Sequence, residues 1–188
     1  AISSYQKAIK IQPNYARAHN NLGIVLQELG ELQKAIGCYE KSIQIDPNYA
    51  EAHNSLGTVL QELGEHQKAI ISYQKAIQIN SNYATAHNSL GTVLQELGES
   101  QKAMGSFEKA IQIQPDYATA HNNLGNIQRE LGKHQKAISS YQKAIQIIPN
   151  YVDFHYNLGI TFSEFGEKQK AISSYQKAIK IQPNYARA

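Results

Sequence analysis

Five histidines recur along this chain at a constant spacing, and imidazole is both a common metal ligand and a common general base. Each histidine lies 34 residues after the one before it, as His19 and His53 illustrate. A zinc site needs three or four ligands that converge at about 2 Å from the metal. Histidines separated by a whole structural unit would form a ladder instead, so we expect packed, hydrogen-bonded side chains and no metal site. The five are His19, His53, His87, His121 and His155.

The other reactive side chains show no pattern typical of an active site. The single cysteine is Cys38. Serine is found 34 and 68 residues after it, at Ser72 and Ser106. No nucleophile is paired with a base, and the sequence has no phosphate-binding loop, dinucleotide fingerprint or H-E-x-x-H motif. We therefore expect no catalytic residues, no cofactor and no enzymatic activity in these residues.

The composition predicts a packed chain with a solvated, mildly basic surface. Of the 188 residues, 41% are hydrophobic and 18% are charged, and the formal net charge is +3. This basicity is too weak to favour a nucleic-acid partner. No apolar run approaches the roughly 20 residues that a membrane-spanning helix needs. One cysteine precludes an internal disulfide and favours an intracellular, reducing compartment, but it leaves the localisation unknown.

The residues around the histidines belong to a repeat of 34 residues. The phrase "AHNNLG" or a close variant surrounds each histidine. Apolar residues at helical spacing, such as Leu22 and Leu26, predict one face of a helix. A glycine such as Gly30 stops this helix, a second helix follows over 33–45, and Pro47 ends it. Each unit is therefore expected to contain helix A, a tight turn, helix B and a loop.

A further series of glycines lies inside helix A, where glycine costs about 1 kcal/mol relative to alanine. We expect helix B of the same unit to approach helix A closely at these positions, because glycine has no Cβ to prevent it. The series is Gly23, Gly57, Gly91, Gly125 and Gly159.

The unit resembles the tetratricopeptide repeat, whose pattern combines Leu-Gly, a large residue, alanine, an aromatic residue, alanine and proline. Histidine replaces the early tryptophan of that family in every unit. The resemblance implies an all-α fold, a right-handed α-α superhelix (solenoid) of helix pairs. The first unit supplies Leu22, Gly23, Leu26, Ala35, Tyr39, Ser42 and Pro47, and the third supplies Leu90, Gly91, Leu94, Ala103, Phe107, Ala110 and Pro115.

The resemblance divides the chain into five full repeats that follow half of another. The first eighteen residues are identical to the last eighteen, so the chain is expected to begin with helix B and its loop alone. We expect it to be a fragment of a longer array. The expected boundaries are 1–15 for the half repeat, 16–49, 50–83, 84–117, 118–151 and 152–185 for repeats 1 to 5, and 186–188 for the start of a further repeat.

In this family helix A lines a concave groove that holds extended peptides, so the resemblance maps peptide-binding positions onto helix A asparagines. An asparagine amide offers both a donor and an acceptor to a peptide backbone of any sequence. The superhelical repeats of O-linked N-acetylglucosamine transferase look similar, with an asparagine ladder along the inner wall, which Ser55 and Ser89 interrupt here. The mapped asparagines are Asn20, Asn54, Asn88 and Asn122 and, one residue later, Asn21, Asn123 and Asn157.

Glutamates near the C-terminal end of helix A form a second predicted ladder. A carboxylate there opposes the helix dipole by roughly 0.3–1 kcal/mol, and an acidic groove would favour a neutral or basic peptide. Family members that clamp a C-terminal carboxylate use lysine and arginine instead, so we do not expect that ligand. Duplication of one incidental glutamate is the alternative explanation. The residues are Glu28, Glu62, Glu96, Glu130 and Glu164.

The expected function is a protein–protein interaction scaffold that binds an extended peptide or partner segment in the helix A groove. One alternative is a self-stacking structural array that polymerises head-to-tail through its open ends. Another is the substrate-recognition arm of a larger glycosyltransferase-like enzyme. The expected partner is thus a protein or peptide, with head-to-tail self-association as a second interaction, and neither a membrane nor nucleic acid is expected.

Overall fold

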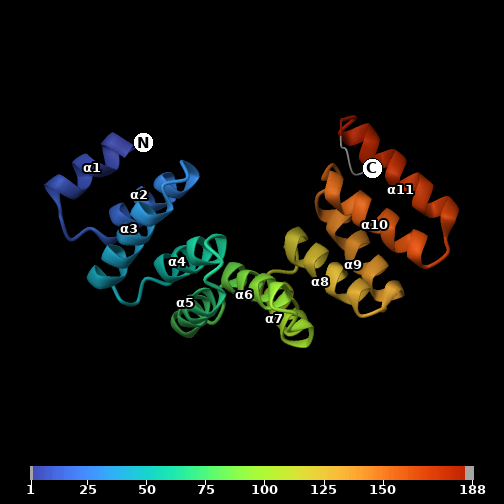
Figure 1. The fold of residues 1–188 in the computed structure, drawn as a ribbon, viewed down its shortest axis with the longest axis horizontal. Helices are drawn as coiled ribbons and strands as arrows, with labels where there is room; N and C mark the ends of the chain where they lie inside the picture. The colour runs from blue at the N-terminus through green and yellow to red at the C-terminus, as the bar shows by residue number, and fades with distance from the viewer. Residues whose placement is uncertain (1, 185–188) are drawn as a thin grey trace. The chain divides into compact units, whose positions relative to one another are not determined.

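The computed structural model describes residues 2–184, which form α-helices and no β-strand (Figure 1). The predicted all-α fold class is confirmed. Even-numbered helices are the A helices of the repeats, and odd-numbered helices are the B helices. The bounds are α1 Ile2–Ile11, α2 Ala16–Glu28, α3 Leu32–Ile45, α4 Ala50–Glu62, α5 His66–Ile79, α6 Ala84–Glu96, α7 Ser100–Ile113, α8 Ala118–Glu130, α9 His134–Ile147, α10 Val152–Glu164 and α11 Lys168–Ile181.

The chain divides into two compact units, residues 1–93 and 94–188, and the division falls inside α6. In the first unit α2 packs on α3 and α4 on α5, and α3 also contacts α4. In the second unit α8 packs on α9 and α10 on α11, and α9 also contacts α10. The division does not follow the expected repeat boundaries, which remain a prediction about sequence units.

The turn between helices A and B takes its shape from a glycine in the left-handed region. Gly30 has φ of +76°, a conformation that a side chain with a Cβ disfavours. Its N–H donates to the Gln27 carbonyl at 2.9 Å, and the Glu31 N–H donates to the Leu26 carbonyl at 2.9 Å. These two bonds form a Schellman motif. The prediction that this glycine ends helix A is therefore confirmed.

Close contact between helices A and B of one repeat is made by glycine against a tyrosine ring. A Cβ built on Gly57 of α4 would lie 2.6 Å from Cε1 of Tyr73 in α5. Tyr73 is only 1% exposed, so its ring has no free space into which it could withdraw. The close approach predicted for the glycines inside helix A is confirmed at four of the five positions, and at Gly91 it stays a prediction. The same contact joins Gly23 to Tyr39, Gly125 to Tyr141 and Gly159 to Tyr175.

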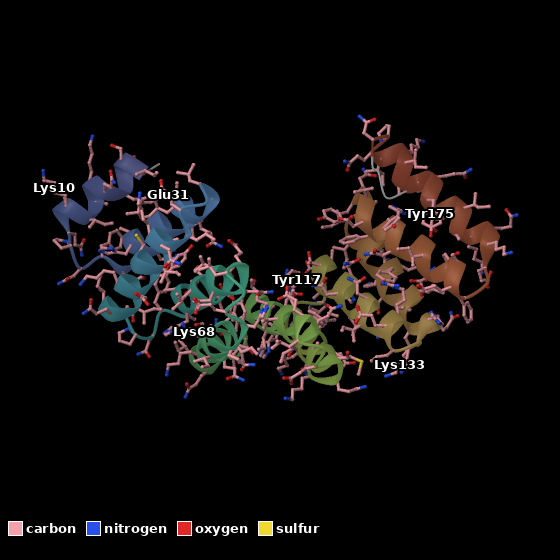
Figure 2. All side chains as sticks on the ribbon, in the orientation of Figure 1. Lys10, Glu31, Lys68, Tyr117, Lys133 and Tyr175 are labelled. Atoms are coloured by element: carbon pink, nitrogen blue, oxygen red, sulfur yellow. The ribbon has the colours of Figure 1, made fainter. Side chains whose placement is uncertain are left out.

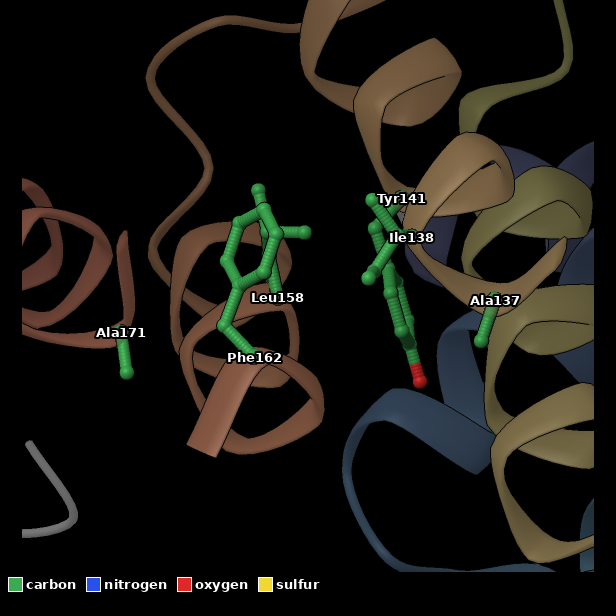
Figure 3. Packing of buried hydrophobic residues seen from close by; sticks show 6 residues of the cluster. All are labelled: Ala137, Ile138, Tyr141, Leu158, Phe162 and Ala171. Atoms are coloured by element: carbon green, nitrogen blue, oxygen red, sulfur yellow. The ribbon is translucent and has the colours of Figure 1, made fainter. Parts of the chain in front are cut away.

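The hydrophobic cores lie between successive helix pairs. In the first unit the side chains of α1 pack against the core made by α2, α3 and α4. In the second unit Figure 3 shows Ile138 and Tyr141 of α9 opposite Leu158 and Phe162 of α10. A buried hydroxyl adds a polar link between helices, because Ser42 Oγ, fully buried, donates to the Ala16 carbonyl at 2.8 Å.

Substitution of two helical glycines by alanine tests the glycine–tyrosine contact. Gly57→Ala should destabilise the protein by about 1–3 kcal/mol, because the new methyl group overlaps the Tyr73 ring. Gly37→Ala is the matched control, since a Cβ there meets nothing within 4 Å, and it should stabilise α3 by up to about 1 kcal/mol. Urea unfolding followed by circular dichroism measures both. Equal effects of the two substitutions would contradict the assigned role of the contact.

Candidate functional site

The histidine ladder is structural. His121 Nε2 donates to the Pro115 carbonyl at 2.9 Å, and His155 Nε2 donates to the Pro149 carbonyl at 2.8 Å. His19, His53 and His87 make the same bond to the residue six positions earlier. The prediction of packed, hydrogen-bonded histidines is therefore confirmed. Within residues 2–184 no three His, Cys, Asp or Glu side chains converge on a point where they could hold a metal ion.

The thiol is poorly reactive, and many lysines bind residues close to them in sequence. Cys38 is half-buried, and burial raises the pKa of its thiol, which disfavours the reactive thiolate. Lysines on the B helices bind neighbours in their own helix, as Lys41 does to Gln44 at 2.8 Å. Figure 2 shows Lys68, which pairs with Glu65 at the start of α5. No helix in the described part of the chain has the length and apolar character to cross a membrane.

Successive A helices touch within each unit, α2 with α4 and α8 with α10. We define the A-helix face of each unit as the polar surface of its A helices. It is formed by the predicted asparagines and glutamates of that unit and by Gln27 and Gln61 in the first unit and Gln95 and Arg129 in the second. Its helices fold locally because alanine, leucine and glutamine favour helix, and their opposite sides are buried against the B helices.

The glutamates of the A-helix face connect one repeat to the next. Glu62 accepts a hydrogen bond from Gln27 Nε2 of the preceding repeat. Glu130 accepts one from Gln95 Nε2 at 2.8 Å. Each contact joins a residue of one A helix to the residue 35 positions later, which lies on the next A helix. All five predicted glutamates are exposed: Glu28, Glu62, Glu96, Glu130 and Glu164.

The predicted asparagines fall into two classes of exposure. Asn157 Nδ2 donates to Asn122 Oδ1 at 3.0 Å, which links α10 to α8 through two amides. Asn20, Asn88 and Asn122 are buried, whereas Asn21, Asn54, Asn123 and Asn157 are half-buried. The half-buried group is therefore the one that a ligand on this face would meet first. The peptide-binding role of both groups remains a prediction.

The buried tyrosine of helix B also reaches the A-helix face. Tyr39 Oη donates to Gln27 Oε1 at 2.7 Å, while the amide nitrogen of Gln27 donates to Glu62. One glutamine thus joins helix B of its own repeat to helix A of the next. Sequence reasoning missed this chain of bonds, although the recurrence of glutamine directly before the glutamate of helix A is visible in three repeats.

Repeat 4 replaces that glutamine with arginine, and its partners change accordingly. Arginine has no acceptor, so Arg129 cannot receive the tyrosine proton as Gln27 does. Tyr141 Oη donates instead to Asn126 Oδ1 at 2.8 Å. Arg129 Nη1 still donates to Glu164 of the next repeat at 2.9 Å. Asparagine at 126, where repeat 2 has Thr58, therefore supplies the acceptor that arginine lacks.

Burial and nearby charge shift the pKa values of the buried tyrosines. Burial, reinforced by the negative charge of Glu62, raises the pKa of Tyr39 above the usual value of 10.0. Burial also raises the pKa of Tyr141, and the positive charge of Arg129 partly offsets that effect. Both phenols therefore act as neutral hydrogen-bond donors near neutral pH. Nothing in these groups provides a base or a nucleophile for chemistry.

Comparison with known proteins now identifies the repeat. Tetratricopeptide repeat profiles match residues 14–82, 48–116, 106–139 and 152–185, and a profile described as TPR repeat matches 125–166. The chain belongs to the tetratricopeptide repeat family. Members of this family are generally non-catalytic scaffolds for protein–protein interaction. No curated protein sequence matches the chain.

Solved structures of tetratricopeptide repeat proteins share the fold. YrrB, described as having an unusual peptide-binding site, aligns with a TM-score of 0.74 and 25% identity, covering 100% of this chain and 96% of YrrB. MamA aligns with a TM-score of 0.76 and 28% identity, covering 89% of this chain and 98% of MamA. PilF of Pseudomonas aeruginosa aligns with a TM-score of 0.85 and 24% identity, covering 92% of this chain and 78% of PilF.

The exchange of hydrogen-bond partners in repeat 4 can be tested with two substitutions. Asn126→Thr alone should cost about 1 kcal/mol, because Tyr141 loses its strong acceptor. Adding Arg129→Gln should recover most of this loss, since it recreates the pair of Thr58 and Gln61 that serves Tyr73 in repeat 2. A double-mutant cycle by urea unfolding measures the coupling. Additive effects would show that the two positions are independent.

Alkaline unfolding tests the raised tyrosine pKa. A group whose pKa is higher in the folded state stabilises that state fully below its unfolded pKa and loses this contribution as pH rises. Stability should therefore fall above the usual tyrosine value of 10.0, by up to about 1.4 kcal/mol per pH unit for each such tyrosine. Tyr39→Phe should reduce the slope, and Phe107 of repeat 3 shows that phenylalanine fits the site, fully buried. If Tyr39→Phe left the slope of stability against pH unchanged, this would contradict the raised pKa of Tyr39.

Proposed function

We propose that this protein is a scaffold that binds an extended peptide of a partner protein along the A-helix face. The observation that carries the proposal is the series of amides and carboxylates that crosses, within each unit, from one A helix to the next. Gln27 and Glu62 form one such crossing, and Asn122 and Asn157 form another. Peptide backbones need donors and acceptors at regular intervals, and amide side chains supply both.

The polar groups of this face are held in place before any ligand arrives. Gln27 is fixed at both ends by Tyr39 and Glu62, and Tyr39 is itself fully buried. Side chains that are already ordered lose less conformational entropy on binding. The proposal is also supported by the likeness to YrrB, whose description names a peptide-binding site.

The exposed glutamates favour a neutral or basic peptide. Glu62 and Glu130 each accept a hydrogen bond from the preceding repeat, and a carboxylate can accept several. Spare acceptor capacity at exposed carboxylates attracts lysine and arginine of a ligand, with an energy that depends on salt.

The two alternatives remain predictions with different physical bases. Self-stacking would use the outer side of α11, where Ile172 and Ile179 are 49% and 43% exposed. Residues 172–181 of α11 are identical to residues 2–11, which form α1. In α1 the side chains of Ile2, Tyr5 and Ile9 pack against the core of the first unit. The role of recognition arm in a glycosyltransferase-like enzyme rests only on the resemblance of the asparagine ladder.

Charge neutralisation on two different faces tests the proposal. Basic peptides selected from an array should lose about fivefold in affinity when Glu62→Gln and Glu130→Gln are combined, because two exposed attractions vanish. Glutamine retains the oxygen that accepts from Gln27 or Gln95, so the contacts between repeats persist. Fluorescence anisotropy at low salt measures the affinity.

A variant with the same change of net charge is the control for this test. Glu40→Gln combined with Glu108→Gln removes two exposed carboxylates from the B helices α3 and α7. It should leave the affinity nearly unchanged if peptides bind the A-helix face. An equal loss in both variants would indicate a general charge effect and would contradict the proposed site.

A further inference from the structure

The turn between helices A and B of repeat 4 has a reversed charge. Lys133 lies where each of the other four repeats has glutamate, directly before helix B. In those repeats the glutamate carboxylate binds the lysine three residues later, across the first turn of helix B. The pairs are Glu31 with Lys34, Glu65 with Lys68, Glu99 with Lys102 and Glu167 with Lys170.

The reversal leaves Lys136 without the carboxylate that its counterparts bind. Lys133 replaces that acid, and neither lysine forms an ion pair with any described residue. The two lysines therefore place two positive charges without an ion-pair partner at a turn where repeats 1 to 3 have one glutamate and one lysine. Like charges repel each other, and a cation at Lys133 also opposes the dipole at the start of α9.

These lysines line a cavity of about 390 Å³ at the end of the turn. Its wall also contains His134 and the ring of Phe165, whose centroids are 6.1 Å apart. Phe165 is 47% exposed, and leucine is found at this position in the other four repeats. Figure 2 labels Lys133 at this turn. The lining of the cavity thus includes two lysine side chains and one exposed aromatic ring.

The carboxylate that faces His134 of the cavity is already engaged. Glu164 accepts a hydrogen bond from Arg129 at 2.9 Å, and its other oxygen lies 3.8 Å from His134 Nδ1. The Arg129 charge compensates that of Glu164. Glu164 therefore does not supply the carboxylate that Lys136 lacks, and the positive charge of the two lysines remains.

We propose that this cavity binds an acidic side chain of a peptide partner, whose carboxylate takes the place of the missing glutamate beside Lys136. Lys133 provides a second ammonium group for the same carboxylate. An apolar residue next to the acidic one packs against Phe165. The cavity borders the A-helix face at Glu164, but its lysines select ligands of the opposite charge, so the two proposals are tested with different probes.

The experiment uses short peptides and the whole chain at low salt. The probe is Gly-Ser-Glu-Leu-Ser-Gly with blocked ends, and Gly-Ser-Gln-Leu-Ser-Gly is the uncharged control. In a ¹⁵N NMR titration the acidic probe should shift amide signals of residues 132–136 and 165, and the glutamine probe should not. Inorganic phosphate and a phosphoserine peptide form two further arms. Stronger shifts with either than with the glutamate probe would overturn the assignment to a carboxylate.

Two variants decide whether these residues form the site. Lys133→Glu restores the ion pair of the sister repeats, so it should fold normally and lower the affinity for the acidic probe by at least about tenfold. Glu31→Lys combined with Leu63→Phe gives repeat 1 the same two lysines and aromatic ring within one compact unit, and it should create a second set of shifts at 30–34. Unchanged binding by Lys133→Glu, or no second site in the double variant, would overturn the proposal.

Discussion

The contact of a helix A glycine with a helix B tyrosine ring is the constraint on which the rest of the structure depends. A Cβ at Gly23 would lie 2.6 Å from Tyr39, so only glycine permits the two helices to lie at this distance. The short distance has a second effect, because it lets the tyrosine hydroxyl reach Gln27 on the A-helix face. Hydrophobic packing and the order of the polar surface thus have one origin.

Departures from the repeat show which parts of this arrangement are interchangeable. Phe107 in repeat 3 keeps the buried ring but has no hydroxyl, and Gln95 nevertheless donates to Glu130. Arg129 in repeat 4 keeps the bond to the next glutamate while Asn126 receives the tyrosine proton. The link between neighbouring A helices is therefore retained, whereas the link to helix B varies. Lys133 reverses the charge of its turn and takes part in neither link.

Most of the fold could be predicted from sequence, and the contacts of the polar face could not. Gly30 and Gly57 have local consequences, a helix stop and a close approach, which periodicity reveals. The bond between Gln27 and Glu62 joins residues 35 positions apart and depends on how A helices lie side by side, which no local pattern specifies. The burial of Asn20 but not of Asn21 has the same cause: a rotation of about 100° per residue decides which amide the neighbouring helices cover.

The most direct test of the account is a map of the amide signals that change when a basic peptide binds. The account predicts changes along α4 and α8, around Asn54, Glu62, Asn123 and Glu130, with the outward side of α5 and α9 unaffected. Changes confined to the B helices, around Lys75 and Lys143, would contradict it.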